Sequence, residues 1–445
     1  MSKLMLILII AAHLSVLSKL IFFPYPEFFV YPYLTNAGLK PYSQILDQHF
    51  PGLMFLPFNF DNLGMNDEIV ARMWLMALVI ITQLLIFFVS REIFKSEKKA
   101  LVVNLLYLIW QPFFEGWVLW IDTFLPLILL PAFYALYKDK IFLTGLLLGM
   151  GIVFKQVLIP LSGLVLIYLI WEIRKMRVIG RYLFGLSLPV ILMVTYFFSI
   201  GVIKDFWYWT IVFNLTTFAQ YGRKGPFFTG VARVGFAIAA SCGVFFSKDK
   251  RMVKTLIIFV LGSLAALYAR FDFVHFQPAL PFVLIATVLG FSAIWKQKWA
   301  RLILTGYLVV IVWWLSVFYS GHLSNKVMFF DEHTKAIAQK IRQYTKEGDK
   351  IFIFGAVPHL YQMTKTKPAG DVFVFQFPWF VMVTEERLLE GLKKDHPEIV
   401  VSDRTVAIEG QKITEFGKGL DEYIQQNYQA VDQVGSTQIL RKFTH

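Results

Sequence analysis

Long apolar segments recur along this chain and are separated by shorter polar connections. Most of them approach the roughly 20 residues that an α-helix needs to cross the hydrocarbon core of a bilayer. Two segments, 141–155 and 157–173, are short, which leaves open a single hairpin or one re-entrant segment. The pattern predicts an α-helical polytopic membrane protein with about eleven transmembrane helices. They are expected at residues 4–23, 69–90, 100–119, 122–137, 141–155, 157–173, 179–200, 226–246, 252–269, 275–295 and 302–320.

The pattern changes after Tyr319, where short helical and strand-like segments alternate. The stretch DEHTKAIAQKIRQYTKEGDKIFIFG predicts a capped amphipathic helix, a turn and a buried strand. We expect further strands at DVFVF, EIVVSD and TQILR, a helix that begins at Thr384 and another helix near 419–427. The stretch FGAVPHLY follows a strand and resembles a ligand-binding turn, but it lacks a GxGxxG pattern, so a structural turn is favoured. The alternation predicts a small soluble α/β domain over residues 326–445, after a membrane domain over residues 1–325.

Composition agrees with a membrane protein and argues against a nucleic-acid partner. The chain is 57% hydrophobic and only 16% charged, whereas charged residues make up about 25% of a typical soluble domain. Residues 326–445 hold 16 Lys and Arg and 16 Asp and Glu, so the net charge of +13 arises in the membrane part. A nucleic-acid-binding protein would favour a basic soluble face.

Lys and Arg gather in alternate connections, namely those that follow the second, fourth, sixth, eighth and tenth apolar segments. Cytoplasmic loops of membrane proteins carry such an excess. We therefore expect a protein of the cell membrane whose N-terminus lies in the cytoplasm. The loops 24–68 and 202–225 and the C-terminal domain are expected on the outer side.

A second set of charged residues then falls in outer loops or at the outer ends of helices. Charges at such depths are costly and are commonly functional, although single members can extend to the lipid headgroups. The set consists of Glu27, Asp47, Glu115, Asp122, Lys155, Arg223, Lys224, Arg270, Asp272 and His275.

The first outer loop offers two candidates for a general base. Glu27 and Asp47 lie in the stretch YPEFFVYPYLTNAGLKPYSQILDQHFPG, whose prolines and Gly38 indicate a folded loop. A carboxylate at a membrane boundary can remove a proton from a hydroxyl group within about 3 Å. Helix capping and surface charge are the alternatives for both residues. Asp47 is slightly favoured because His49 and Pro51 follow it in the order DxHxP.

Three other stretches offer cations for a phosphate group. Lys155 and Gln156 follow a glycine-rich helix face in the stretch LTGLLLGMGIVFKQVLIP. Arg223 lies in the loop 202–225. YARFDFVHFQPALP places Arg270, Asp272 and His275 at the outer end of a hairpin, where the arginine can hold phosphate oxygens bidentately. Two alternatives to phosphate binding remain. Lys155 can extend to the lipid headgroups, and Arg270 and Asp272 can form an ion pair that only fixes the hairpin. No metal or cofactor is expected, because no Cys/His pair has ligand spacing.

These motifs together resemble those of the GT-C glycosyltransferases, in particular the bacterial branch related to protein O-mannosyltransferases and aminoarabinose transferases. The resemblance covers roughly residues 5–320. The sequence departs from the family pattern at two positions. Many relatives carry Asp near the position of Glu27, and many carry Asp at the position of Gln44. The matching residues are Glu27, Gly38, Pro41, Tyr42, Asp47, His49, Pro51, Gly145, Gly149, Lys155, Gln156, Arg270, His275, Pro278 and Pro281.

The resemblance implies a hexosyl or pentosyl transferase that moves a sugar from a polyprenyl-phosphate donor to an acceptor hydroxyl. The reaction would take place on the outer face of the membrane and invert the anomeric carbon. An outer-loop carboxylate, Asp47 or Glu27, would be the base. Lys155, Arg270, His275 and Arg223 would hold the donor phosphate. His49, Glu115, Asp122, Gln156 and Asp272 are further candidates for the site.

Two other classes of protein remain as alternatives. A transporter or lipid flippase would use charges at the membrane midplane and an internal repeat, and we find no repeat in the sequence. A membrane anchor for the C-terminal domain would leave the outer set of charges unexplained. As an enzyme, the protein would bind a polyprenyl-phosphate-linked sugar and an acceptor lipid, glycan or protein.

Overall fold

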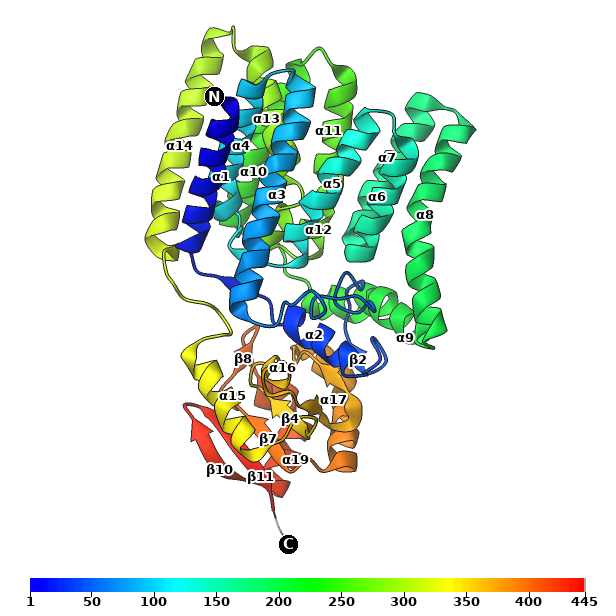
Figure 1. Ribbon diagram of the computed structural model, residues 1–445, viewed down its shortest axis with the longest axis vertical. Helices are drawn as coiled ribbons and strands as arrows, with labels where there is room; N and C mark the ends of the chain where they lie inside the picture. Colours follow the sequence, from blue (N-terminus) through cyan, green and yellow to red (C-terminus); the bar gives the residue numbers. More distant parts are fainter. Residues whose placement is uncertain (444–445) are drawn as a thin grey trace. The chain divides into compact units, whose positions relative to one another are not determined.

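The computed structural model describes residues 1–443, and the chain folds into two compact units (Figure 1). The first, which we call the helical unit, comprises residues 1–23, 71–193 and 224–326. The second, which we call the mixed unit, comprises residues 24–70, 194–223 and 327–445. The segments 24–70 and 194–223 contain most of the two predicted outer loops, so these loops fold with the C-terminal region.

Each of the eleven predicted apolar segments coincides with a helix or a continuous helical run. Six runs among the described residues are long and apolar enough to cross a membrane, and α1, α5, α6 and α13 are shorter apolar helices. The helices are α1 Ser2–Ser18, α3 Glu68–Phe94, α4 Glu97–Phe113, α5 Ile121–Tyr137, α6 Ile141–Phe154, η1 Gln156–Leu158, α7 Ile159–Tyr168, η2 Leu169–Ile173, α8 Met176–Ser199, α10 Phe228–Ser241, η5 Cys242–Phe246, α11 Lys250–Ser263, α12 Ala265–Ala269, η6 Phe273–Phe276, α13 Leu280–Ile294 and α14 Lys298–His322. The short strands β1 Phe23–Pro24 and β3 Val118–Leu119 complete this part.

Local sequence explains where several of these helices begin. The Ser96 side chain accepts a hydrogen bond from the backbone N–H of Lys99 at the start of α4, and Asp249 accepts one from Met252 at the start of α11. Such caps satisfy backbone donors that the first turn of a helix leaves free. In α7 and α13 a proline occupies the first turn, where its missing N–H costs nothing.

The glycine-rich face of α6 packs closely against α8. A Cβ atom added to Gly145 would lie 2.2 Å from the carbonyl oxygen of Tyr182, and one added to Gly149 would lie 2.4 Å from that of Leu186. Gly185 of α8 meets the backbone of Phe142 in the same way. Small residues thus let the two backbones approach closely.

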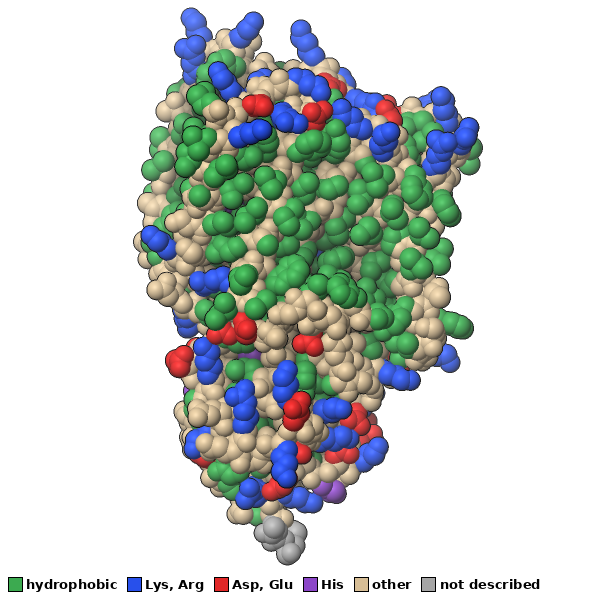
Figure 2. Space-filling model, viewed as in Figure 1, with side chains coloured by type: hydrophobic (Ala, Val, Ile, Leu, Met, Phe, Trp, Pro, Cys, Tyr) green, Lys and Arg blue, Asp and Glu red, His purple; other side chains and the backbone are tan. Residues whose placement is uncertain are grey.

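Charge is distributed unevenly over the helical unit. Figure 2 shows apolar side chains along the helices, with Lys and Arg gathered at the end that carries the N-terminus of α1. The five basic connections each carry an exposed lysine, namely Lys98, Lys140, Lys175, Lys250 and Lys296. An apolar band next to a basic end is the pattern of a polytopic membrane protein.

The mixed unit contains the predicted α/β fold. Its sheet has the order β10-β11-β7-β4-β5, in which β4 pairs in parallel with β7 and β5, and the other pairs are antiparallel. The strands are β2 Ile45–Leu46, β4 Lys350–Phe354, β5 Lys367–Pro368, β6 Phe373–Val374, β7 Ile399–Ser402, β8 Ala407–Ile408, β9 Gln411–Lys412, β10 Tyr428–Val434 and β11 Thr437–Lys442. The helices are α2 Glu27–Asn36, α9 Ile203–Trp207, η3 Tyr208–Val212, η4 Asn214–Gly222, α15 Glu332–Tyr344, α16 Leu360–Thr364, η7 Ala369–Asp371, α17 Pro378–Asp395, α18 Ile413–Phe416 and α19 Lys418–Asn427.

The predicted elements of this region are present, although α17 begins earlier than predicted and several short elements were not predicted, namely α16, β5, β8, β9, α18 and the strand β10. Helix α17 begins at Pro378, six residues before the predicted start at Thr384, because a proline suits the first turn of a helix. The strand β10, which pairs with β11, was not predicted. Its sequence YQAVDQV is polar and its side chains are largely exposed, as suits an edge strand.

Both outer loops are tied to the C-terminal region within the mixed unit. In the first loop, β2 pairs in parallel with β6, with Ile45 opposite Phe373 and Leu46 opposite Val374. In the second, the ring of Phe213 stacks on Phe380 of α17, with centroids 5.1 Å apart. The two loops therefore have fixed conformations although they are distant in sequence from the sheet.

Candidate active site

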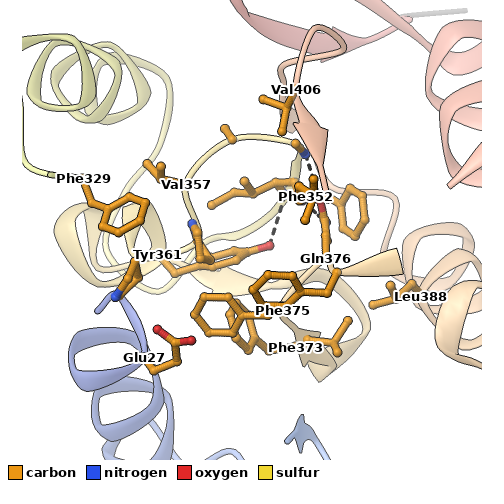
Figure 3. A pocket seen from close by; sticks show the side chains of 18 of the residues that line it. Glu27, Phe329, Phe352, Val357, Tyr361, Phe373, Phe375, Gln376, Leu388 and Val406 are labelled. Carbon is orange, nitrogen blue, oxygen red and sulfur yellow. Dashed lines mark hydrogen bonds between the residues drawn. The ribbon is translucent and has the colours of Figure 1, made fainter. Parts of the chain in front are cut away.

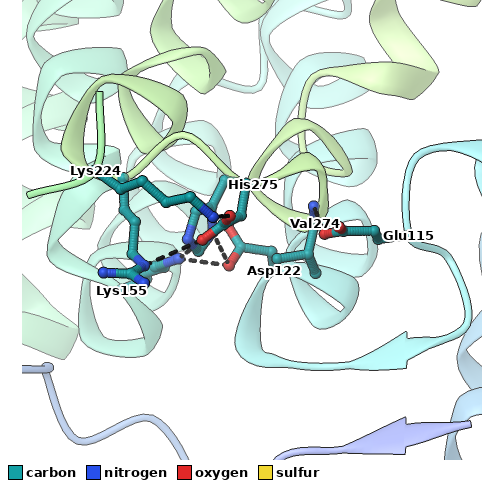
Figure 4. Close-up of polar contacts among 8 residues, drawn as sticks. Glu115, Asp122, Lys155, Lys224, Val274 and His275 are labelled. Atoms are coloured by element: carbon teal, nitrogen blue, oxygen red, sulfur yellow. Dashed lines mark hydrogen bonds and ion pairs between the residues drawn. The ribbon is translucent and has the colours of Figure 1, made fainter. Parts of the chain in front are cut away.

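A buried ion pair lies in the helical unit, where three predicted residues converge (Figure 4). Asp122 lies in the first turn of α5, Lys155 directly follows α6, and His275 lies in η6. The Lys155 ammonium donates to Oδ2 of Asp122. Nδ1 of His275 lies 2.9 Å from the same oxygen and 3.2 Å from Nζ of Lys155. The charges of Lys155 and Asp122 therefore balance each other.

A second group of charges follows in the hairpin that leads to His275. Nε of Arg270 donates to Oδ2 of Asp272 over 3.1 Å, and Nζ of Lys224 donates to Oδ1 over 2.6 Å. Two cations thus share one carboxylate. All three side chains are partly exposed, so they are accessible to an anionic group.

Neighbouring polar residues fix the backbone of this hairpin. Oε2 of Glu115 accepts from the backbone N–H of Val274 over 2.9 Å (Figure 4). Gln277 donates to the carbonyl oxygens of Gln111 and Phe114. These bonds hold η6 to the end of α4, so Glu115 contacts the backbone next to His275. Gln156 is half-buried in η1, directly after Lys155.

In the mixed unit, Asp47 is buried and has several hydrogen-bond donors. Its Oδ2 accepts from the Tyr31 hydroxyl over 2.5 Å. Its Oδ1 accepts from the backbone N–H of His49 over 2.7 Å and lies 2.8 Å from Nδ1 of the same residue. The Tyr42 hydroxyl donates to the carbonyl oxygen of His49. Both carboxylate oxygens of Asp47 are therefore engaged in holding the loop together.

Glu27 has a different environment at the start of α2. Its side chain is 7% exposed, and its Oε2 is buried without a hydrogen-bond partner. Burial, with a smaller contribution from the charge of Asp47, raises the pKa of Glu27 to about 8. A buried carboxyl oxygen without a partner is costly, and raised pKa values are common among groups that exchange protons.

Glu27 borders a cavity of about 310 Å³ in the mixed unit (Figure 3). The walls come from the turn after β4, from β6 and the residues that follow it, and from the loop before β8. Figure 3 shows the Glu27 carboxylate beside Phe375, at the edge of a group of aromatic and aliphatic side chains. The volume lies at the lower end of the range for small-molecule sites.

Sequence reasoning missed the walls of this cavity. For the turn FGAVPHLY, a structural role was favoured over ligand binding, yet Gly355, Ala356, Val357 and Pro358 line the cavity. The aromatic residues of FVFQF also line it, although their alternation indicates a strand. The sequence feature that could have predicted the cavity is a strand followed by a glycine-containing turn, with a second, aromatic strand close by in the sequence. Without the fold, this feature is only a weak indication of a binding site.

The predicted site residues thus fall into two groups. The helical unit holds Glu115, Asp122, Lys155, Gln156, Arg270, Asp272 and His275, and the mixed unit holds Glu27, Asp47, His49 and Arg223. Arg223 is exposed directly after η4. Within residues 1–443, no group of three or more His, Cys, Asp or Glu side chains is arranged to hold a metal ion.

Comparisons with known proteins identify the fold. No protein-family model matches the chain, and no curated protein matches it by sequence. The crystal structure of ArnT from Cupriavidus metallidurans bound to undecaprenyl phosphate matches 98% of this chain and 97% of that chain, with a TM-score of 0.62 and 12% identity. A structure of a mutant of the arabinofuranosyltransferase AftD from Mycobacteria matches all of this chain and 42% of that chain, with a TM-score of 0.53 and 12% identity. The chain therefore has the GT-C fold, and the predicted fold class is confirmed.

Proposed function

We propose that this protein is a membrane glycosyltransferase that moves a sugar from a polyprenyl-phosphate donor to an acceptor hydroxyl on the outer face of the membrane. The observation that carries the proposal is the match to ArnT over nearly the full length of both chains, in a structure that contains undecaprenyl phosphate. A shared fold alone does not fix a function, so the proposal also relies on the two groups of charged residues. No observation specifically favours a transporter or flippase.

Arg270 and Lys224 are the groups that we assign to the donor phosphate. Both donate to Asp272, and both side chains are partly exposed. An arginine can bind two phosphate oxygens at once, and cations near the leaving group stabilise charge that develops there in the transition state. Arg223 remains a further candidate for phosphate contact.

Lys155, Asp122 and His275 have a supporting role in this proposal. The ammonium of Lys155 is already neutralised by Asp122, and both side chains are buried. Removing one partner of a buried ion pair leaves an uncompensated charge, which typically costs about 3–5 kcal/mol. The group thus fixes the position of η6, and with it the hairpin that carries Arg270.

Glu27 is the group that we assign as the base, in preference to Asp47. A base needs a free lone pair within reach of the acceptor hydroxyl. Glu27 has an oxygen without a partner next to a cavity, whereas the oxygens of Asp47 are bonded to Tyr31 and His49. Asp47 and His49 hold the shape of the loop, and the charge of Asp47 contributes to the raised pKa of Glu27.

In the proposed reaction, the carboxylate of Glu27 takes the proton of the acceptor hydroxyl. The acceptor oxygen forms a bond to the anomeric carbon of the sugar. The bond from that carbon to the phosphate oxygen breaks, and the polyprenyl phosphate leaves with the electron pair. A single displacement of this kind inverts the anomeric carbon.

Binding of the lipid phosphate tests the donor site. We expect Arg270→Ala in the purified full-length protein to weaken the binding of undecaprenyl phosphate by roughly 10-fold to 150-fold. A hydrogen bond to a charged group is worth about 1.5–3 kcal/mol, and each 1.4 kcal/mol corresponds to tenfold in affinity. Affinity can be measured by competition against a fluorescent polyprenyl phosphate.

Arg301→Ala is the matched control, because Arg301 is an exposed arginine in the first turn of α14, within a connection that the sequence predicts to be cytoplasmic. It should bind the lipid phosphate as the unmodified protein does. Equal affinity in the Arg270→Ala and Arg301→Ala variants, with both folded, would show that the donor phosphate binds elsewhere.

A further inference from the structure

The side chains of Gln376 and Tyr361 in the cavity walls are hydrogen-bonded to backbone groups. The side chain of Gln376 donates to the carbonyl oxygen of Ile353 and accepts from the backbone N–H of Gly355. The hydroxyl oxygen of Tyr361 accepts from the backbone N–H of Ile353. Oε2 of Glu27 is therefore the acidic oxygen in the lining that has no partner.

The other walls of the cavity are apolar. Phe352, Phe373, Phe375 and Phe377 line it together with aliphatic residues such as Val357 and Leu388. Phe375 and Phe377 stack with centroids 6.2 Å apart, and Phe373 stands perpendicular to Phe375. Such a wall gains by contact with an apolar chain or ring.

This distribution limits the kind of group that the cavity can hold. A saccharide ring carries several hydroxyl groups, and each one buried without a partner costs free energy. The unpaired Oε2 of Glu27 lies among mainly apolar side chains, which matches a group with a single hydroxyl on an apolar carrier. A site built from few polar groups discriminates strongly against ligands whose polar groups it cannot pair.

We propose that the acceptor carries its reactive hydroxyl on an apolar group, either an alkyl chain or an aromatic ring, and that this group binds in the cavity beside Glu27. The inference rests on the proposed function and names the acceptor class. Because the walls come mainly from the turn after β4 and from the residues of β6 and those that follow it, the C-terminal region acts in acceptor recognition.

Photolabelling of the full-length protein in nanodiscs tests the inference. The probes are an alkyl alcohol and a phenylalkyl alcohol that each carry a diazirine, and methyl glucoside serves as a saccharide competitor. We expect label on peptides that contain residues 352–377 from at least one alcohol, with no competition by methyl glucoside. Stronger labelling by the alkyl alcohol would indicate an acceptor with an alkyl chain, and stronger labelling by the phenylalkyl alcohol would indicate one with an aromatic ring.

Substitutions that fill the cavity provide the variants. Val406→Trp and Val357→Trp place an indole in the cavity wall, and each should reduce labelling at least tenfold. Val431→Trp is the matched control, because Val431 is exposed in β10, and it should be labelled as the unmodified protein is. Equal labelling in all three folded variants, label confined to other peptides, or effective competition by methyl glucoside would overturn the inference.

The same variants separate this inference from the proposed function. Labelling in the cavity without any sugar transfer to the alcohols or other hydroxyl acceptors would support the binding site and contradict the glycosyltransferase assignment. Sugar transfer that is unchanged in Val406→Trp and Val357→Trp would contradict the acceptor site and leave the glycosyltransferase assignment standing.

Discussion

At the scale of residues, two carboxylates of one loop have different environments. Asp47 accepts from Tyr31 and His49 with both oxygens, whereas one oxygen of Glu27 is buried without a partner. The sequence indicates that the loop is functional but slightly favours Asp47. It could not distinguish the two, because the difference depends on the hydroxyl of Tyr31 and on cavity walls more than 300 residues away from Glu27.

The raised pKa of Glu27 predicts the pH dependence of the reaction. A general base acts in its deprotonated form, and the pKa of about 8 means that this form is the minority at pH 7. We expect kcat/KM to rise about tenfold per pH unit below pH 8 and to level off above it. A profile that is already flat from pH 5 upward would exclude Glu27 as the base.

At the scale of elements, the helices of the apolar segments were easier to predict from the sequence than the helices and strands of the mixed unit. Each predicted span coincides with a helical run because about 20 apolar residues leave little choice of structure in a bilayer. The start of α17 and the strand β10 were missed because their sequences, PWFVMV and YQAVDQV, have no clear helical or strand period. Their structures depend on partners that are distant in sequence, such as β11.

The contact between α6 and α8 gives a prediction at this scale. Gly145→Val places side-chain atoms against the backbone of Tyr182, and overpacking of this kind typically costs about 1–3 kcal/mol. We expect a lower Tm in detergent, measured by intrinsic fluorescence. Gly180→Val is the matched control, because no atom lies within 4 Å of a Cβ at this α8 position. An equal Tm for the two variants would contradict the close packing of α6 on α8.

At the scale of the whole molecule, charge and chain connectivity support one orientation. The basic connections lie at one end of the helical unit (Figure 2), while the outer loops and the C-terminal region form the mixed unit. Positive charge favours the cytoplasmic side. The proposed orientation therefore places the N-terminus in the cytoplasm and the mixed unit outside.

Cysteine labelling in intact cells tests this orientation. In a Cys242→Ala background, Lys98→Cys and Lys412→Cys introduce thiols at exposed positions in the first turn of α4 and in β9. We expect a membrane-impermeant maleimide to label Lys412→Cys in intact cells, and Lys98→Cys only after the cells are opened. Labelling of Lys98→Cys from outside would reverse the orientation.

The most direct test of the central claim is the rate of sugar transfer in proteoliposomes. The unmodified protein, Glu27→Gln and Asp47→Asn are compared with a panel of polyprenyl-phosphate hexoses and pentoses and with alcohol, glycan and peptide acceptors. We predict transfer by the unmodified protein, and a loss of about 10²-fold to 10⁴-fold in Glu27→Gln with undecaprenyl phosphate affinity unchanged. We expect a smaller loss in Asp47→Asn. No transfer by the unmodified protein with any pair of substrates, or a near-normal rate in Glu27→Gln, would contradict the account.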